Sequence, residues 1–243
     1  MEQATPQVRA RHRVTHLVPR AARRWPYQAS DRVVGALDAR RLRAARPDVA
    51  TALAAPGDDA ALRGVYDHYV ADVSQWDWAV SWPTARALDA LCTGLRPTRI
   101  LDLGSGFSTY TICNWARRTG AHPDVVSVDD SREWLDKTRD FLAADGLEAT
   151  LLDVTDLSTL PDASFDLAFD DLGRIEVRSS MIDTLTRVMA PGGVVVLDDM
   201  NVRGYRAQVR TKLTRARWPL YSLRPSTIDA KGRFAMLTAA PAK

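Results

Sequence analysis

Short apolar runs that alternate with helical segments in the second half of the sequence limit the possible folds more than any other feature. Five runs are rich in apolar and β-branched residues, at 98–103, 124–129, 149–154, 165–170 and 192–199. Between most of them lie segments with helical spacing of apolar residues, at 108–118, 131–145 and 176–190. Alternating strands and helices form βαβ units, and strands this apolar are covered by helices on both faces. The sequence therefore predicts a doubly wound, mostly parallel α/β fold.

The two ends of the chain differ from this middle part. Two further apolar runs, at 218–225 and 232–240, are expected to pair as antiparallel strands at one sheet edge. Residues 1–28 lack sustained periodicity and are predicted to be irregular. Helical spacing then predicts three helices, one from Ser30 as N-cap to before Pro47, one over 58–74 and one over 81–95. We therefore expect a basic N-terminal arm and helical cap over residues 1–95 and a Rossmann-like domain over residues 96–243.

Composition narrows the class of protein. No run of eighteen or more apolar residues occurs, and no apolar segment follows the basic N-terminus, so neither a transmembrane helix nor a secretory signal is expected. The two cysteines, Cys92 and Cys113, have no metal-ligand spacing, which suits a reducing compartment. We therefore expect a cytoplasmic protein that does not associate with membranes.

Basic residues gather in two stretches although the formal net charge is only +3. Arginines outnumber acids between Arg9 and Arg46, and a second basic run covers residues 203–217. Such runs are ordinarily solvated helix faces or tails, but they also suit an anionic partner such as RNA. The role of the basic N-terminal arm stays open.

The stretch ILDLGSGFST, at residues 100–109, ends the first predicted strand and begins a helix. It therefore lies at the carboxyl edge of the sheet, where ligands bind in such folds. Gly104 and Gly106 allow positive φ angles and close approach of the backbone. The stretch has no lysine for a phosphate-binding P-loop, and Thr109 stands where a dinucleotide loop has its third glycine. ATP and NAD are therefore both poorly supported.

Acidic residues at the ends of three strands suit a different ligand. Asp129 follows the second strand and can accept both ribose hydroxyls of an adenosine, while Asp153 follows the third and can accept from an adenine amine. Both also suit helix N-caps. Asp102 precedes the glycine loop and could order it or face a ligand ammonium group. A nucleoside that bears an amino acid fits this set better than a dinucleotide.

Four motifs, ILDLGSGFST, VVSVDDSREWL, LLDVTDLSTLPDASFDLAF and LTRVMAPGGVVVLDD, follow one another between residues 98 and 199. Together they resemble the successive motifs of class I S-adenosylmethionine-dependent methyltransferases. The resemblance implies a seven-stranded sheet with a reversed last strand, and S-adenosyl-L-methionine as cofactor. It also implies the cofactor-binding residues: Gly104, Ser105 and Gly106 for the methionine and ribose, Asp129 for the ribose, Asp153 and Val154 for the adenine, the backbone around Asp170 near the sulfonium, and Ser81 as a weaker candidate beside the carboxylate.

The chain also distantly resembles the catechol O-methyltransferase group, in which acids after the fourth and fifth strands, followed by an Asn, bind Mg²⁺. Asp171 and Asp199 match the two acids, but Met200 occupies the third position and Asn201 comes one residue late. A divalent metal at Asp171 and Asp199 is therefore an option that the sequence does not favour. Without it, Asp199 is the candidate general base, or it orients the acceptor, with loop capping as its alternative role.

Aromatic residues between positions 66 and 82 are candidates for binding the methyl acceptor. Tyr66, Trp76 and Trp78 could wall a pocket for a planar or hydrophobic molecule, or could pack the helical cap on the sheet. Further candidates are His68 for acid–base catalysis, with a surface position as its alternative, and Arg178 and Tyr205 at the mouth of the site.

These observations predict a methyltransferase that acts on a hydroxyl, or an amine, of a small molecule by in-line methyl transfer. The alternatives are an RNA methyltransferase that uses the basic arm, and a non-catalytic cofactor-binding scaffold. Nucleic acid is disfavoured because FDDLG after the fourth strand lacks the [ND]PP[YF] pattern of many amino-directed nucleic-acid enzymes. The intact acids at the strand ends argue against a scaffold, and a homodimer stays open.

Overall fold

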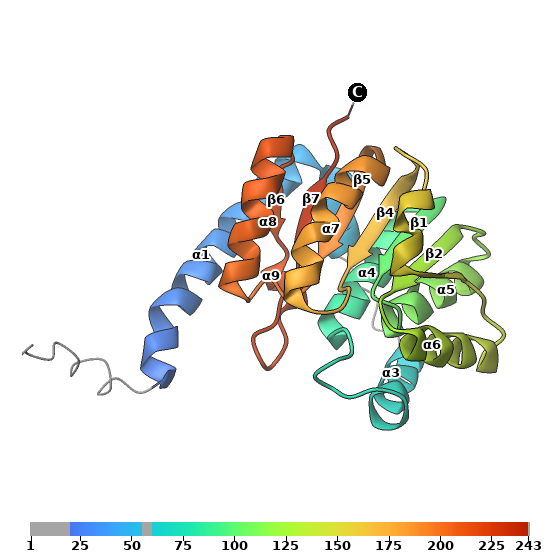
Figure 1. Ribbon diagram of the computed structural model, residues 1–243. Coiled ribbons are helices and arrows are strands. Elements are labelled where there is room, and N and C mark those ends of the chain that lie inside the picture. Colours follow the sequence, from blue (N-terminus) through green and yellow to red (C-terminus); the bar gives the residue numbers. More distant parts are fainter. Residues whose placement is uncertain (1–19, 55–59, 243) are drawn as a thin grey trace, which may run out of the picture.

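The computed structural model describes residues 20–54 and 60–242, and these residues confirm the predicted sheet (Figure 1). Seven strands are arranged in the order β3-β2-β1-β4-β5-β7-β6. They are β1 Arg99–Leu103, β2 Asp124–Asp129, β3 Thr150–Asp153, β4 Phe165–Asp170, β5 Met189–Leu197, β6 Leu220–Ser222 and β7 Met236–Ala239. Neighbouring strands from β3 to β5 are parallel, whereas β7 runs antiparallel to both β5 and β6. The final pair of strands therefore forms the predicted antiparallel edge.

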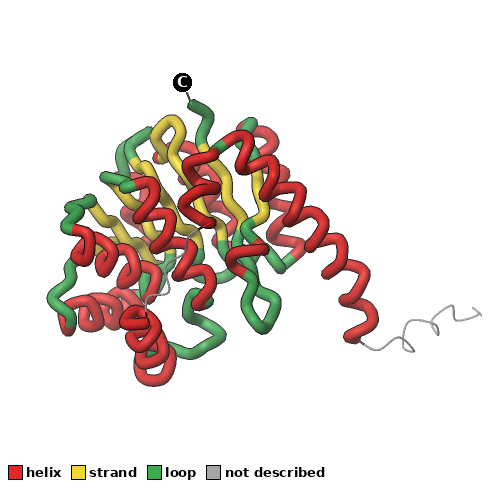
Figure 2. Tube along the Cα trace, turned by 180° about the vertical axis from the view of Figure 1, so that it is seen from behind, coloured by secondary structure: helices red, strands yellow, loops and turns green. Residues whose placement is uncertain are grey.

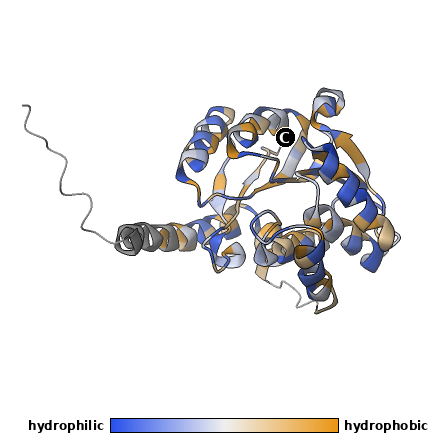
Figure 3. Cartoon of the chain, turned by 60° about the horizontal axis from the view of Figure 1, so that its bottom comes forward, coloured by the Kyte–Doolittle hydropathy of each residue, from blue (hydrophilic) through white to orange (hydrophobic). Residues whose placement is uncertain are grey.

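Helices cover both faces of this sheet, as Figure 2 shows from behind. They are α1 Arg20–Ala45, α2 Pro47–Ala54, α3 Ala60–Asp72, α4 Trp82–Leu95, α5 Phe107–Thr119, α6 Arg132–Ala144, α7 Ile175–Val188, α8 Arg203–Ala216 and α9 Arg224–Thr227, with a 3₁₀ helix η1 at Val154–Thr159. Figure 3 shows apolar strands enclosed by helices whose outer sides are polar. This arrangement explains why the strand sequences are almost continuously apolar.

The alternation of side chains along the strands divides the interior into two cores. Ile100 of β1 and Phe169 of β4 face one core, which also contains apolar residues of α2, α3, α4 and α5. Leu101 and Ala168, the neighbouring residues, face the other core, together with residues of α7 and α8. Because successive strand residues point to opposite faces, one short run supplies both cores.

The N-terminal helix α1 begins at Arg20, so the prediction of irregular structure was wrong for residues 20–28 and Ser30 does not cap the helix. Tertiary contacts on the inner side of α1 hold it. Asp38 is buried and accepts a hydrogen bond from the backbone N–H of Ser222 in β6 at 3.1 Å. Residues 1–19, the rest of the predicted arm, lie outside the described residues.

Three α-helices were missed from the sequence, namely α2, α8 and the short α9. The segment of α8 was read only as a basic run, yet Tyr205, Val209 and Leu213 are buried at intervals of four residues. Helices from the first 95 residues share a core with the sheet, and the boundary between residues 95 and 96 stays a prediction. Within residues 20–54 and 60–242, no helix has the length and apolar character needed to span a membrane.

Candidate active site

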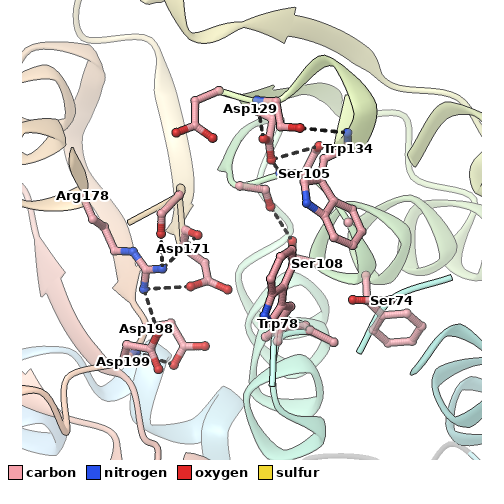
Figure 4. Close-up of a pocket in the computed structure, with 18 of the residues that line it drawn as sticks. Ser74, Trp78, Ser105, Ser108, Asp129, Trp134, Asp171, Arg178, Asp198 and Asp199 are labelled. Atoms are coloured by element: carbon pink, nitrogen blue, oxygen red, sulfur yellow. Dashed lines mark hydrogen bonds and ion pairs between the residues drawn. The ribbon is translucent and has the colours of Figure 1, made fainter. Parts of the chain in front are cut away.

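A cavity of about 780 Å³ opens at the carboxyl ends of the central strands (Figure 4). Strand β1 lies between β2 and β4, so the chain turns from one half of the sheet to the other at this point. Such a switch point leaves a crevice because the two following helices pack on opposite faces. The volume is within the range of pockets that enclose a small ligand.

The predicted glycine loop lines the cavity. Gly104 has φ +103, and a Cβ atom there would lie 2.7 Å from the carbonyl carbon of Asp171, so the close packing of β1 against β4 requires glycine. A Cβ atom at Gly106 would lie 2.9 Å from the hydroxyl of Tyr69. Helix α5 begins directly after this loop, and the partial positive charge at its N-terminus favours an anionic group of a ligand.

Asp129 lines the cavity at the end of β2 and is fixed by its neighbours. One carboxylate oxygen accepts from the backbone N–H of Ser105 at 2.9 Å and from its hydroxyl at 3.3 Å. The other accepts from the backbone N–H of Ser131 at 2.9 Å. Because a carboxylate offers about four acceptor positions, capacity for a ligand hydroxyl remains. Burial raises the pKa of Asp129 to about 6, although the two backbone N–H donors oppose this shift.

Five residues predicted to contact the cofactor do not line the cavity, and they are Asp102, Asp153, Val154, Asp170 and Ser81. Asp102 orders the glycine loop, one of the two roles weighed from the sequence, because it is fully buried and accepts from the hydroxyls of Ser108 and Thr109. Ser81 caps α4 through the N–H of Thr84.

The other three have local roles at the ends of β3 and β4. Asp153 caps η1 through the N–H and hydroxyl of Thr155, the capping role weighed from the sequence, and Val154 is the first residue of η1. The side chain of Asp170 is buried next to the hydroxyl of Tyr205, which donates to it at 3.4 Å. The prediction concerned the backbone around Asp170, and the next residue, Asp171, lines the cavity. The direction of these side chains depends on packing, which the motif positions do not contain.

The predicted pair Asp171 and Asp199 does converge, but a guanidinium lies between them. Arg178 of α7 approaches Asp171 Oδ1 at 2.8 Å and Asp199 Oδ2 at 3.1 Å through the same nitrogen, Nη1. Asp198 also lines the cavity and accepts from the backbone N–H of Asp199 at 2.8 Å. Figure 4 shows these four side chains on one side of the cavity, opposite Trp78 and Trp134.

Burial and charge act in opposite directions in this group. Burial raises the pKa of Asp198 to about 8, and the nearby carboxylates of Asp171 and Asp199 add to the shift. Burial also raises the pKa of Asp171, although the guanidinium of Arg178 offsets part of this effect. For Arg178 itself, burial disfavours the charged form, but the carboxylates of Asp171, Asp170 and Asp199 outweigh it and raise the pKa.

The residues present do not fit a divalent ion between Asp171 and Asp199. The guanidinium already pairs with one oxygen of each carboxylate, Met200 is fully buried, and a thioether is a poor ligand for a hard cation. In the part of the chain that the structure describes, no group of three or more His, Cys, Asp or Glu side chains is arranged to hold a metal ion.

The aromatic candidates divide between core and cavity. Trp78 lines the cavity and is 65% exposed, whereas Trp76 lies outside the lining with Lys231 Nζ 4.0 Å from its ring centroid. Tyr66 is buried against Trp82 and is part of the core. Tyr66 therefore has the alternative role weighed from the sequence, in which an aromatic residue packs the helical cap on the sheet.

His68 has the surface position that was weighed as its alternative, whereas Tyr205 does not lie at the mouth of the site. His68 follows Tyr66 by two residues, so it lies on the outer side of α3, where it is 64% exposed and pairs with Asp72 at 2.7 Å. Tyr205 is fully buried on the inner side of α8, and its predicted position at the mouth was wrong. The lining of the cavity includes neither His68 nor Tyr205.

Sequence reasoning missed several residues of the cavity wall, among them Trp134, Asp198 and Arg233. Trp134 lies in the first turn of α6, with its ring centroid 6.1 Å from that of Trp78, and its position soon after β2 could have revealed it. Asp198 directly precedes the predicted site residue Asp199. Arg233 holds the loop that carries Trp78, since it donates to the carbonyls of Trp76 and Ala79 at 3.3 Å.

Comparison with known sequences adds two matches. The family described as "Methyltransferase domain" matches residues 96–226, more than half of the chain. The methyltransferase GfsG of Streptomyces halstedii is 31% identical over 150 residues, which are 54% of this chain and 52% of GfsG. The chain thus matches about half the length of this curated relative.

Solved structures of low sequence identity share the fold. The O-methyltransferase TomG of Streptomyces achromogenes, in complex with SAM, superposes with a TM-score of 0.60 at 21% identity, over 77% of this chain and 92% of TomG. A putative O-methyltransferase of Klebsiella pneumoniae gives 0.60 at 20% identity, over 88% of this chain and 100% of that one. The O-methyltransferase of Bacillus cereus, in complex with SAH, gives 0.59 at 16% identity, over 86% and 98%. These structures bear on the fold alone.

Proposed function

Because the chain belongs to the methyltransferase-domain family of class I S-adenosylmethionine-dependent enzymes, we propose that it methylates a hydroxyl group of a small-molecule acceptor. The observation that carries this proposal is a single cavity with two kinds of acid. Asp129 lies at its cofactor end, and Asp198 and Asp199 lie across from the aromatic wall. The names of the similar proteins TomG and the Klebsiella protein support oxygen as the acceptor atom.

The cavity residues fit the cofactor. Asp129 would accept from ribose hydroxyls, and Ser105 holds that carboxylate in place. The backbone of Gly104, Ser105 and Gly106, with the N-terminus of α5, would receive the methionine portion and its carboxylate. When bound, S-adenosylmethionine supplies an electrophilic methyl group on its sulfonium.

The remaining task of the chain is to position the acceptor and take up its proton. A hydroxyl must lose its proton to become a good nucleophile, whereas an amine need only be neutral. Asp199 lines the cavity, and its Oδ1 is not part of the ion pair with Arg178, so this oxygen would accept the proton. Trp78 and Trp134 would hold the apolar body of the acceptor so that its oxygen attacks in line with the S–CH₃ bond.

The test uses the full-length protein, S-adenosylmethionine and a panel of phenols, aliphatic alcohols and primary amines of matched size. Mass spectrometry would detect the gain of a methyl group, and NMR would assign it to oxygen or nitrogen. We expect an O-methyl product, and less of it from Asp129→Ala when S-adenosylmethionine is below saturation. Methylation confined to amines, or transfer to RNA but to no small molecule, would contradict the proposal.

A further inference from the structure

Arg178 is a buried charged residue of the cavity wall, and every nitrogen of its guanidinium group has an acceptor. It is only 4% exposed. Besides its ion pairs with Asp171 and Asp199, its Nη2 donates to the carbonyls of Asp171 and Gly173, each at 3.1 Å, and its Nε donates to that of Leu172 at 3.4 Å. All three nitrogens therefore have acceptors in the loops that follow β4 and β5.

Burying a guanidinium is costly unless its hydrogen bonds are satisfied, as they are here. The planar fork of arginine suits two carboxylates and several carbonyls at once, which lysine could not match. Asp171 follows β4 and Asp199 follows β5, so one side chain from α7 links the ends of two neighbouring strands.

The turn at Asp199 shows what this link holds in place. Asp199 has φ +54, a left-handed conformation that non-glycine residues rarely adopt. Its backbone N–H donates to Asp198, and its carboxylate is held by Arg178. Local strain of this kind persists only where the surroundings fix it, and it often accompanies preorganised groups at functional sites.

We infer that the guanidinium of Arg178 takes the place of a divalent cation between Asp171 and Asp199, and that Arg178 is the positioning residue for Asp199. Its charge offsets that of the acids, and its geometry sets the direction of the Asp199 carboxylate. The first half of this inference, that Arg178 replaces a divalent cation, concerns the chain alone. The second half, that Arg178 positions Asp199, rests on the proposed function. The two can therefore fail separately.

The first experiment measures Mn²⁺ binding to the full-length protein by electron paramagnetic resonance. In Arg178→Ala the carboxylates lose their internal cation, so we expect Mn²⁺ to bind at least about tenfold more tightly than to wild type, a change of about 1.4 kcal/mol. Arg178→Ala with Asp199→Asn should lose this gain, and Arg174→Ala, a change elsewhere on the cavity wall, should behave as wild type.

Equal Mn²⁺ affinity of wild type and Arg178→Ala would overturn the first half of the inference. Because Arg178 is buried, Arg178→Lys serves as a second variant that keeps a positive charge in a folded chain. It should bind Mn²⁺ no better than wild type, and stronger binding would also contradict the assignment. The Mn²⁺ experiment needs no methyl acceptor, so it tests the first half of the inference even if the proposed reaction is wrong.

The second experiment measures kcat and KM with the acceptor that the panel described under Proposed function yields. Wild-type kcat should be unchanged by EDTA. Arg178→Lys should lower kcat about tenfold at unchanged affinity for S-adenosylhomocysteine, because the fork that directs Asp199 is lost while the charge remains. Millimolar guanidinium should partly restore kcat in Arg178→Ala, an effect that a merely structural role would not produce. Loss of wild-type activity in EDTA with recovery in Mg²⁺, or no rescue by guanidinium, would overturn the positioning role.

Discussion

Asp129 and Asp199 both present a carboxylate to the same cavity, but they are held in different ways. Asp129 is fixed by two backbone N–H groups and one hydroxyl, all neutral donors. Asp199 is fixed by the charged guanidinium of Arg178 and stands in a left-handed turn. Neutral donors leave an anion that can accept further hydroxyls, whereas a guanidinium sets both the charge and the direction of its partner. The comparison suggests a binding role for Asp129 and a chemical role for Asp199.

The largest expected effect is the loss of kcat when the carboxylate of Asp199 is removed. Asp199→Asn should lower kcat for methyl transfer by about 10²-fold, the usual scale for losing a general base. Affinity for S-adenosylhomocysteine, measured by calorimetry, should change little because Asp129 is untouched. The matched control is Asp198→Asn on the same turn. Full activity of Asp199→Asn would return this residue to a capping role.

Removing the carboxylate of Asp129 should have a smaller effect, and it should change the affinity for the cofactor product and not kcat. Asp129→Ala removes an acceptor of charge-assisted hydrogen bonds, so S-adenosylhomocysteine should bind about tenfold more weakly or worse. Calorimetry on the folded variant measures this, with Asp130→Ala as the neighbouring control. Unchanged affinity would remove Asp129 from the cofactor site.

The same comparison predicts a pH dependence of cofactor binding. Burial raises the pKa of Asp129 from 3.8 to about 6, and ribose hydroxyls need the ionised form as acceptor. Affinity should therefore fall as the pH falls through 6. At pH 5 only about a tenth of the carboxylate is ionised, so binding should be about tenfold weaker than at pH 7.5. Asp129→Ala should lack this dependence, and an equal slope in that variant would point to another group.

The aromatic wall should contribute less than either acid. Trp78→Ala removes an exposed indole next to Trp134, so the KM for an apolar acceptor should rise about two- to tenfold, the range of one aromatic contact. Trp76→Ala is the control because Trp76 does not line the cavity. Equal effects of the two substitutions would mean that both act through the stability of their shared loop.

Deleting residues 1–19 should have the smallest effect on the cavity. Every described residue that lines it lies between positions 69 and 233, so cofactor affinity should stay unchanged. The intact chain should bind RNA only weakly, and less as salt rises. Tight binding to one RNA near physiological salt, lost in the truncated chain, would favour the RNA methyltransferase alternative.

Apolar periodicity in the sequence determined the strands and the position of Asp129 at a strand end. The sheet could be predicted because strand identity depends on a few neighbouring residues, and parallel strands bring their carboxyl ends to one edge. The same reasoning placed Asp171 and Asp199 close together, which the ion pairs with Arg178 confirm. Sequence reasoning misplaced the start of α1, because this helix is held by contacts with distant segments. It missed α8, because the many basic residues of this segment hid its apolar positions.

Only the tertiary structure decided what each acid faces. Asp170 and Asp171 are adjacent in sequence, yet one is buried beside Tyr205 and the other lines the cavity with Arg178. Strand alternation separates them, but the partner of each depends on how α7 and α8 rotate against the sheet. The choice between the two roles of His68 was settled in a similar way, since the side of α3 on which it lies is set by the burial of Tyr66 and Tyr69. A sequence motif can place an acid at a strand end, but the cation that meets it comes from another element through packing.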